Sequence, residues 1–247
     1  MKRLLYGFLI SLVIVCLVVA GCGQETPKIR VATDATWPPF ESVNEQTKEI
    51  EGFDIDLFKA IAEEEDLDIE FINVAWDPLL AGIAQCQYDV AISAMSITEE
   101  RQEKMLFSDP YFTAGQLVTV HIDNAEINSK DDLGGKVVGA QIGTTGSFAV
   151  EEIEGATLKT YDDIGLAFQD LMNGQIDAVI ADNPLVYGYV GKNPDKLKSV
   201  GEVFTSEDYG IAVCKTKADL LAKINSGLAA VKAEGLIEEL IDKWLVE

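Results

Sequence analysis

The chain alternates short apolar runs typical of strands with amphipathic runs typical of helices, and this order restricts the fold more than any other feature. Apolar positions in the helical runs recur at helical spacing with acidic residues between them, as on surface helices. A series of strand, helix, strand, helix and strand predicts a parallel sheet covered by helices. The predicted order is strand 29–33, helix 52–65, strand 69–74, helix 78–85 and strand 90–94.

The second half of the chain repeats this order. The segments 87–92 and 175–180 also match locally, which supports two lobes of similar build. Two further helices are predicted to close the chain, at 217–234 and 236–244. In this half the predicted order is strand 137–140, helix 147–152, strand 158–160, helix 164–172 and strand 178–181.

The N-terminus has the features of a secretory signal. Lys2 and Arg3 precede an apolar run, 4–20, and small residues precede Cys22, so we expect a signal peptide over 1–21. Residues 19–22 resemble the lipobox of bacterial lipoproteins, which implies a lipidated Cys22 followed by a linker over 22–28. The alternative is an uncleaved membrane anchor. In both cases the rest of the chain is expected outside the cytoplasmic membrane.

The charge of the chain excludes two classes of partner. The net charge is −23, which argues against binding to nucleic acid or to an anionic membrane surface. No later apolar run approaches the length of a membrane span. About 225 residues remain after the signal, enough for two modest lobes with cores of their own.

Two cysteines remain after the signal and the lipid site, Cys86 and Cys214. We expect them to be free, partly buried thiols, with a disulfide as the alternative. There is no Cys-x-x-Cys motif and His121 is the only histidine, so no metal site is expected.

Polar residues follow the predicted strand 90–94 where ligands of open α/β sheets bind, beyond the carboxyl ends of the strands. Ser93, Ser96 and Arg101 lie there, and Thr98 can cap the helix that carries Arg101. A guanidinium at such a site can hold a carboxylate with two parallel hydrogen bonds. The alternative is that Arg101 is a surface residue paired with a nearby acid.

Two features in the second half resemble ligand-binding elements. The turn 143–146 lies between a strand and a helix, so the N–H groups and hydroxyls of Thr144 and Thr145 can bind an anion. It is not a P-loop, because no lysine follows, and a plain structural turn is the alternative. Asp182 ends a predicted strand and can either cap the next helix or face a ligand ammonium.

Two tryptophans follow strands in the first half. Asp34 ends the first strand, Trp37 follows three residues later, and Trp76 is expected in a loop after the second strand. An acid beside flat aromatic faces suits a polar or cationic side chain.

Several segments together resemble one protein family, and the resemblance covers nearly the whole chain after the signal. The chain is similar to the polar amino-acid-binding proteins of bacterial ABC importers, the extracellular solute-binding proteins of family 3. This resemblance implies two α/β lobes of the type II periplasmic-binding-protein fold, each a mainly parallel sheet flanked by helices, joined by two hinge strands. It implies no cofactor. The segments that carry it are 34–40, 52–57, 93–101, 107–111, 143–146 and 181–184.

The resemblance implies a role for each candidate residue. Arg101 would hold the ligand carboxylate, aided by Ser96, Thr144 and Thr145. Asp182 and the polar groups around Ser93 and Ala94 would hold the α-ammonium. The remaining residues would form the side-chain pocket: Asp34, Trp37, Trp76 and Gln141 as its lining, with Asp54 adding charge. Ala94 departs from the family pattern, and the residue at the position of Gln141 varies among its members. The choice of ligand is therefore the least determined property.

The resemblance also implies the lobe boundaries. The first lobe is predicted over 29–110 and 210–247, the second over 116–204, and the hinges over 111–115 and 205–209. Since Arg101 and Asp182 belong to different lobes, a buried zwitterion is fully paired only when the lobes close.

Arginine or another basic amino acid is the expected ligand, because a guanidinium can stack on tryptophan and pair with Asp34 at once. Glutamine is the second candidate. The expected partner is the membrane permease of an ABC importer, and the protein is expected to be a monomer and not an enzyme. The alternatives are an enzyme like cyclohexadienyl dehydratase and a ligand-binding sensor domain.

Overall fold

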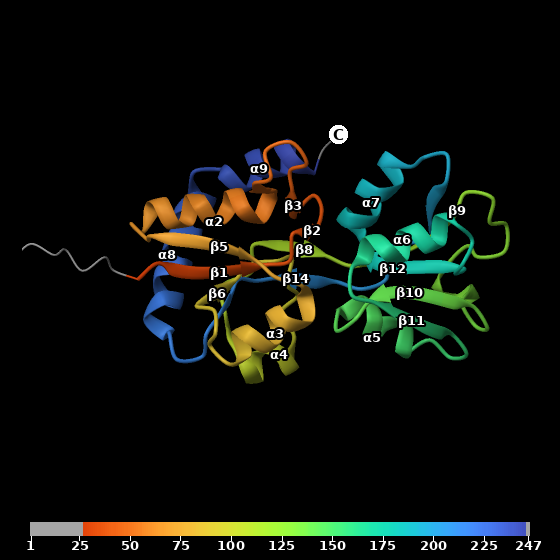
Figure 1. The fold of residues 1–247 in the computed structure, drawn as a ribbon, viewed down its shortest axis with the longest axis horizontal. Helices are drawn as coiled ribbons and strands as arrows, with labels where there is room; N and C mark the ends of the chain where they lie inside the picture. Colours follow the sequence, from red (N-terminus) through yellow and green to blue (C-terminus); the bar gives the residue numbers. More distant parts are fainter. Residues whose placement is uncertain (1–26, 246–247) are drawn as a thin grey trace, which may run out of the picture.

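The computed structural model describes residues 27–245, which form two α/β lobes side by side along the long axis of the molecule (Figure 1). The predicted signal peptide 1–21, the lipidation site Cys22 and most of the predicted linker 22–28 lie outside the described residues. No helix within 27–245 combines the length and the apolar character needed to cross a membrane.

The first lobe is built on a five-stranded sheet in the order β5-β1-β6-β15-β7. The central strand β1 pairs in parallel with β5 and β6, while β15 runs antiparallel to both β6 and β7. The last three residues of β1 are buried, as expected for a strand with both faces covered. The strands are β1 (Ile29–Thr33), β5 (Ile69–Asn73), β6 (Val90–Ala91), β7 (Leu106–Phe107) and β15 (Ala212–Val213).

Helices cover both faces of this sheet. On one face, the packed apolar residues join α2, α8 and α9 to Val31 and Val90; on the other, α3 packs against Ala32 and Ala91. A small antiparallel sheet, β2-β3-β4, lies beside α2. These elements are α2 (Phe53–Glu64), α3 (Trp76–Ala84), α4 (Glu99–Lys104), α8 (Ala218–Ala233), α9 (Leu236–Trp244), β2 (Thr36–Trp37), β3 (Glu41–Val43) and β4 (Ile50–Glu51).

The second lobe repeats this architecture, with a sheet in the order β11-β10-β12-β9-β13. Its first three strands are parallel, and β9 is antiparallel to both β12 and β13. The helix α6 buries Ile164, Ala167, Phe168 and Leu171, at helical spacing, and Asp163 caps it. The elements are β9 (Gln116–His121), η1 (Lys130–Asp132), β10 (Val137–Gln141), α5 (Thr145–Glu151), β11 (Thr157–Tyr161), α6 (Ile164–Met172), β12 (Ala178–Asp182), α7 (Asn183–Lys192) and β13 (Leu197–Val200).

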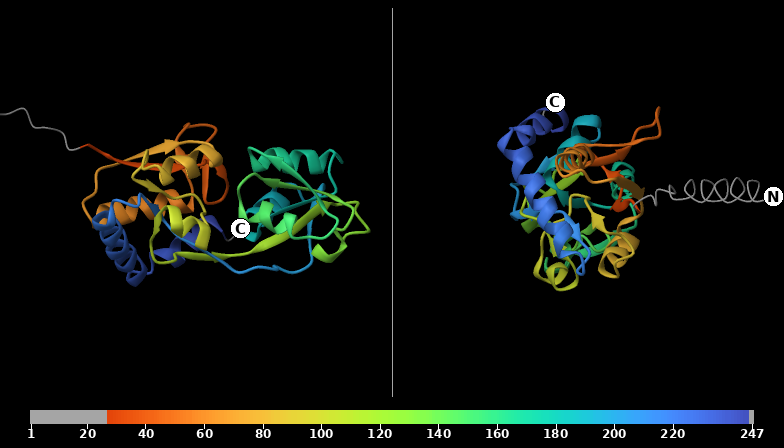
Figure 2. Two further views of the ribbon diagram at one scale, coloured as in Figure 1. Left: turned by 90° about the horizontal axis from the view of Figure 1, so that it is seen from below. Right: turned by 90° about the vertical axis from the view of Figure 1, so that its left-hand side faces the viewer.

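Two strands run between the lobes. They are β8 (Phe112–Ala114) and β14 (Glu207–Tyr209), which form an antiparallel two-stranded sheet. Figure 2 shows the chain crossing from one lobe to the other along these segments. They fall within 111–115 and 205–209, the segments predicted as hinges.

Two predicted elements differ from the observed ones near the pocket. The strand predicted over 90–94 ends at Ala91, because the chain leaves the sheet and turns at Ala94, whose φ is 43°. The helix predicted over 78–85 begins at Trp76, since Pro78 lies in its first turn and needs no N–H partner there. Trp76 therefore lies on a helix and not in a loop.

The prediction of two free thiols is wrong. Cys86 and Cys214 form a disulfide, with their Cα atoms 5.0 Å apart and a sequence separation of 128. Cys86 follows α3 and Cys214 follows β15, and both pack in the same apolar cluster. The folding of the first lobe brings these distant segments together, which no local pattern indicates.

Candidate functional site

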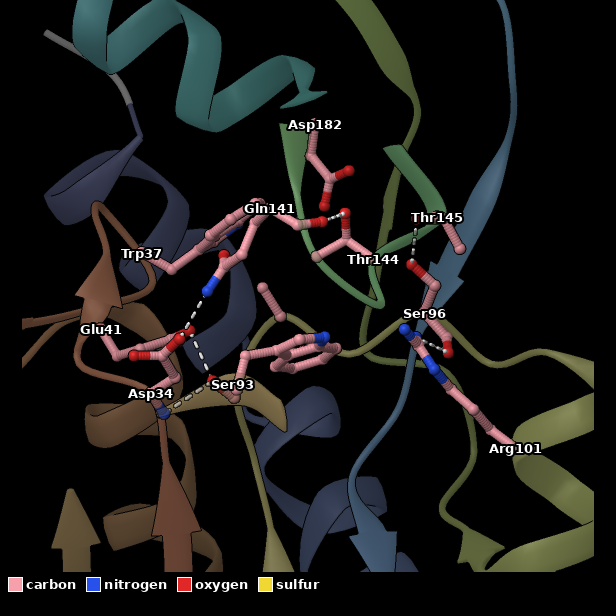
Figure 3. A pocket seen from close by; sticks show the side chains of 12 residues that line it. Asp34, Trp37, Glu41, Ser93, Ser96, Arg101, Gln141, Thr144, Thr145 and Asp182 are labelled. Atoms are coloured by element: carbon pink, nitrogen blue, oxygen red, sulfur yellow. Dashed lines mark hydrogen bonds between the residues drawn. The ribbon is translucent and has the colours of Figure 1, made fainter. Parts of the chain in front are cut away.

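A pocket lies where the two lobes meet, at the carboxyl ends of β1, β10 and β12 (Figure 3). The space between its lining atoms is about 310 Å³, part of it open to solvent. Of the twelve ligand-binding residues predicted, eleven line it, and Asp54 does not. The lining residues are Asp34, Trp37, Glu41, Trp76, Ser93, Ala94, Ser96, Arg101, Gln141, Thr144, Thr145 and Asp182.

Asp34 forms one end of the pocket. Its carboxylate accepts hydrogen bonds from Thr36 Oγ1 at 3.0 Å and from Gln141 Nε2 at 2.9 Å, and its N–H donates to Ser93 Oγ at 3.0 Å (Figure 3). Burial raises the pKa of Asp34, and the bonds from Gln141 and Thr36 oppose this. All its side-chain partners are neutral, so this acid is placed to pair with a cation.

Trp37 and Trp76 supply the aromatic wall. Both side chains are buried, and neither indole N–H has a hydrogen-bond partner among the described residues. Because a buried indole N–H normally finds a partner, each is available to a molecule in the pocket. The ring of Trp76 also lies 5.1 Å from the guanidinium carbon of Arg101, within cation–π range.

Arg101 forms the opposite end of the pocket. Thr98 caps α4 by accepting the N–H of Arg101, and the helix places this side chain inside the protein, 7% exposed. Its guanidinium donates to the carbonyl of Ser96 at 2.8 Å and to that of Gly143 at 3.2 Å. Burial lowers the pKa of Arg101, while the charges of Asp182 and Glu207 oppose this.

Arg101 has no ion pair within residues 27–245. Its two bonds to carbonyl groups leave most of the guanidinium N–H donors available. The alternative, a surface residue paired with an acid, is therefore wrong. A buried and unpaired guanidinium is a site for an anion.

The turn 143–146 brings the second lobe to Arg101. Gly143 has φ of 70°, a left-handed conformation that favours glycine, and its carbonyl accepts from Arg101. Thr144 caps α5 by accepting the N–H of Ser147, and Thr145 Oγ1 lies 3.4 Å from Ser96 Oγ. Since Arg101 and Ser96 belong to the first lobe, these contacts hold the lobes together at this end of the pocket.

Asp182 lies in the pocket wall at the end of β12. It occupies the cap position of α7, but its side chain makes no capping bond. Its two oxygens instead accept from Gln116 Nε2 and from Tyr209 Oη. Burial, together with the charge of Glu207, raises the pKa of Asp182 to about 7. The capping alternative is therefore wrong.

Two acidic residues differ from expectation. Asp54 is buried behind the wall, where its carboxylate accepts from the N–H of Ala94 at 2.7 Å and from Tyr111 Oη at 2.8 Å. Glu41, which was not predicted, lines the pocket and accepts from Ser93 Oγ at 2.9 Å. The only signal for Glu41 was an acid directly after the motif that contains Trp37. No group of three or more metal-binding side chains occurs within 27–245.

Two similar α/β lobes that share a buried polar pocket define a two-lobed binding protein that encloses a small molecule. The chain belongs to the bacterial extracellular solute-binding proteins of family 3, whose family model matches residues 29–247. The resemblance seen in the sequence and the expected two-lobed fold are confirmed.

Named relatives agree with this assignment. The chain is 37% identical over 222 residues to the putative ABC transporter arginine-binding protein 2 of Escherichia coli K12, covering 87% of this chain and 90% of the relative. It is 42% identical to a solved ancestral arginine-binding protein bound to arginine, with a TM-score of 0.84 and 89% and 98% of the two chains covered. A solved ancestral arginine-binding protein bound to glutamine gives a TM-score of 0.85 at 42% identity, covering 90% of this chain and 99% of that chain.

Proposed function

We propose that the protein captures a polar L-amino acid outside the cytoplasmic membrane, arginine foremost, and delivers it to the permease of an ABC importer. The observation that carries this proposal is the buried guanidinium of Arg101, which has no ion pair among residues 27–245 and faces a pocket lined by acids. An amino acid has both a carboxylate and an ammonium, and each must be paired on burial.

The proposed ligand orientation follows from the two ends of the pocket. Arg101 binds the carboxylate, with Ser96 and Thr145 beside it, and Asp182 pairs with the α-ammonium near Ser93 and Ala94. The ligand side chain then extends toward Asp34 and Gln141 along the two tryptophans. A guanidinium suits this end, because it can stack on an indole while donating to a carboxylate.

Arginine and glutamine differ at Asp34. An arginine side chain supplies a cation to that carboxylate, whereas glutamine supplies only a neutral amide. The relatives named as arginine-binding favour the cation, and the related structure bound to glutamine keeps the amide as the second candidate.

Titration calorimetry of the purified protein, stripped of carried-over ligand, against the free amino acids tests this proposal. We expect arginine to bind most tightly and Arg101→Ala to weaken binding by more than about tenfold, since a charge-assisted pair is lost. Lys104→Ala is the matched control, because Lys104 lies on the same helix but is exposed. Unchanged affinity in Arg101→Ala, or binding of acidic or aliphatic amino acids only, would overturn the assignment.

We propose that the protein binds its ligand without changing it. The described part of the pocket offers only carboxyl groups for proton transfer, and each is already bonded to neighbouring groups. A dehydratase of the cyclohexadienyl type is the alternative, and turnover of a cyclohexadienyl acid by the purified protein would support it.

Closure of the lobes accompanies binding in this proposal. The lobes comprise 29–110 with 210–247, and 116–204, and they move about 111–115 and 205–209. Three contacts between the lobes would break on opening: Asp34 with Gln141, Ser96 with Thr145, and Arg101 with Gly143. Small-angle X-ray scattering with and without ligand should show a more compact particle when ligand is present; identical profiles would contradict this.

Anchoring and oligomeric state complete the proposal. The mature protein would be a monomer tethered through a lipid on Cys22. Intact mass measurement after expression with its signal should show a lipid mass on the mature protein, and Cys22→Ser should release the protein from the membrane fraction. Light scattering should give the mass of one chain.

A further inference from the structure

Two acidic side chains, Glu41 in the pocket lining and Asp54 behind it, lie together with no lysine or arginine paired to them among residues 27–245. Both are fully buried, Glu41 at the start of β3 and Asp54 in the first turn of α2. No lysine or arginine in the described part of the chain forms an ion pair with either one. Two buried carboxylates without a cation are unfavourable, so the arrangement requires another source of stabilisation.

The backbone brings these acids together. The N–H of Asp54 donates to the carbonyl of Phe40 at 3.0 Å, which ties the start of α2 to the residue before Glu41. Gly52 allows this approach, because a Cβ there would lie 2.0 Å from the same carbonyl oxygen. The close contact between β3 and α2 is therefore a built feature of the fold.

Each acid uses only one oxygen to hold the pocket wall. Glu41 Oε1 accepts from Ser93 Oγ at 2.9 Å, and Asp54 Oδ2 accepts from the N–H of Ala94 at 2.7 Å and from Tyr111 Oη. The other oxygens, Glu41 Oε2 and Asp54 Oδ1, are buried and have no partner among the described residues. Since a buried polar atom without a partner is costly, these two oxygens need an explanation.

A single shared proton would give both of these oxygens a hydrogen-bond partner. We propose that Glu41 and Asp54 share one proton between Oε2 and Oδ1, and that this pair positions Ser93 and Ala94 in the wall of the binding pocket. The part of the proposal that concerns ligand affinity rests on the proposed amino-acid binding. The proton turns two unsatisfied acceptors into a donor and an acceptor, and no bond other than this hydrogen bond forms or breaks.

The ionisation behaviour of the two acids agrees with this geometry. Burial and the neighbouring Asp54 carboxylate raise the pKa of Glu41 well above its usual range. Burial raises the pKa of Asp54 to about 7, and its hydrogen bonds from Ala94, Tyr111 and Glu41 oppose this. The other titratable groups facing the pair are Asp34 after β1 and Tyr111 before β8.

The pair acts on the pocket through Ala94. Ala94 has φ of 43°, a left-handed conformation that is unfavourable in a residue other than glycine. The bond from its N–H to Asp54 holds it there, and the chain then turns toward Ser96 and Arg101. Glu41 and Asp54 are thus positioning residues, which act on the ligand through Ser93 and Ala94.

Infrared spectroscopy of the ligand-free protein at pH 8 tests the shared proton. A protonated carboxylic acid has a C=O stretching band that an ionised carboxylate lacks. In Glu41→Gln an amide N–H replaces the proton toward Asp54, and in Asp54→Asn an amide N–H replaces it toward Glu41. We expect each single substitution to remove the same band, whereas the exposed control Glu45→Gln keeps it. A band that survives in Asp54→Asn would show that the proton belongs to Glu41 alone and would overturn the shared pair.

Ligand titration separates positioning from general packing. Glu41→Gln keeps an acceptor for Ser93 and a donor for Asp54, so we expect its affinity to stay within about threefold of the parent. Glu41→Leu removes both and should weaken binding by more than about tenfold. Equal losses in the two variants would overturn the positioning role.

The infrared measurement and the ligand titration test separate claims. If no amino acid binds the parent protein, the proposed function is wrong, and the infrared result still decides whether the proton is shared. If the parent binds but the band is absent, the proton-sharing pair is wrong and the proposed function stands.

Discussion

The side-chain amide of Gln141 in the second lobe donates a hydrogen bond to the carboxylate of Asp34 in the first lobe, at 2.9 Å in a buried environment. The same amide donates to the carbonyl of Asp162 at 3.0 Å, so Gln141 is held in place by its own lobe. One end of the pocket is therefore assembled from both lobes, and the ligand side chain that fits there must suit this pair.

Gln141→Leu is predicted to increase the selectivity of the pocket for arginine over glutamine. It leaves one oxygen of Asp34 without its partner, which costs about 1–3 kcal/mol unless the ligand supplies a donor. A guanidinium supplies strong donors, so arginine affinity should change by less than about threefold while glutamine affinity falls more than about tenfold. Calorimetry with both ligands gives the ratio, and equal losses would contradict the assigned orientation.

Arg101→Lys should weaken the binding of every amino acid to a similar extent. Lysine keeps the charge but lacks the planar fork that donates to Ser96, to Gly143 and to a carboxylate at once. We expect a loss of about tenfold, or about 1.4 kcal/mol, for arginine and glutamine alike. The reverse exchange Lys104→Arg on the exposed face of the same helix is the control. If affinity fell for only one amino acid, the ligand's side chain, and not its carboxylate, would lie at Arg101.

Asp182 should make the stability of the ligand-free protein depend on pH. Its pKa rises from 3.8 to about 7 on folding, so the folded state binds this proton more tightly than the unfolded state. This contribution to stability is complete below pH 3.8 and is lost as the pH rises through about 7. We expect the Tm of the parent to fall between pH 5 and pH 8 by more than that of Asp182→Asn. Parallel curves would contradict the raised pKa.

The same proton should be displaced by ligand. An ammonium beside Asp182 favours the ionised acid, so binding near pH 6 should release a proton to the buffer. Calorimetry in buffers with different ionisation enthalpies measures this release.

The disulfide is predicted to stabilise the first lobe without affecting the pocket. It closes a long loop, because Cys86 and Cys214 have a sequence separation of 128. Replacing both by serine should lower the free energy of unfolding by about 2–5 kcal/mol. Neither residue lines the pocket, so ligand affinity should remain within about twofold of the parent. Denaturant unfolding tests the predicted loss of stability, and calorimetry tests the unchanged ligand affinity. A thiol count without reductant shows whether the disulfide forms.

Glu207 links the strand β14 to both lobes. Its carboxylate accepts from Ser96 Oγ of the first lobe at 2.8 Å and from Gln116 Nε2 of the second at 3.0 Å. Glu207→Ala should weaken binding about tenfold, because these bonds stabilise the closed arrangement. Asp208→Ala is the control, since that neighbouring side chain is exposed and, within residues 27–245, bonds only to Thr113. Equal effects would indicate that β14 tolerates no change at either position.

Local patterns predicted the elements whose signals lie in adjacent residues. The helices α6 and α9 and the strand β1 have the expected bounds, because periodicity and flanking polar residues mark both ends. The strand 90–94 was predicted too long. Residues 92–94 leave the sheet to form the pocket wall, and the turn at Ala94 depends on Asp54 of a separate helix.

The sequence by itself determined the two-lobed α/β architecture, the family and most residues of the pocket, because strand ends and helix starts carry their own chemical signals. Only the tertiary structure decided which acid lines the pocket. Glu41 and Asp54 look alike in sequence, yet one lines the pocket and the other lies behind it. It also decided that Cys86 and Cys214 are joined and that Arg101 has no ion pair within residues 27–245. These outcomes depend on contacts between segments far apart in the chain, and local sequence patterns do not specify such contacts.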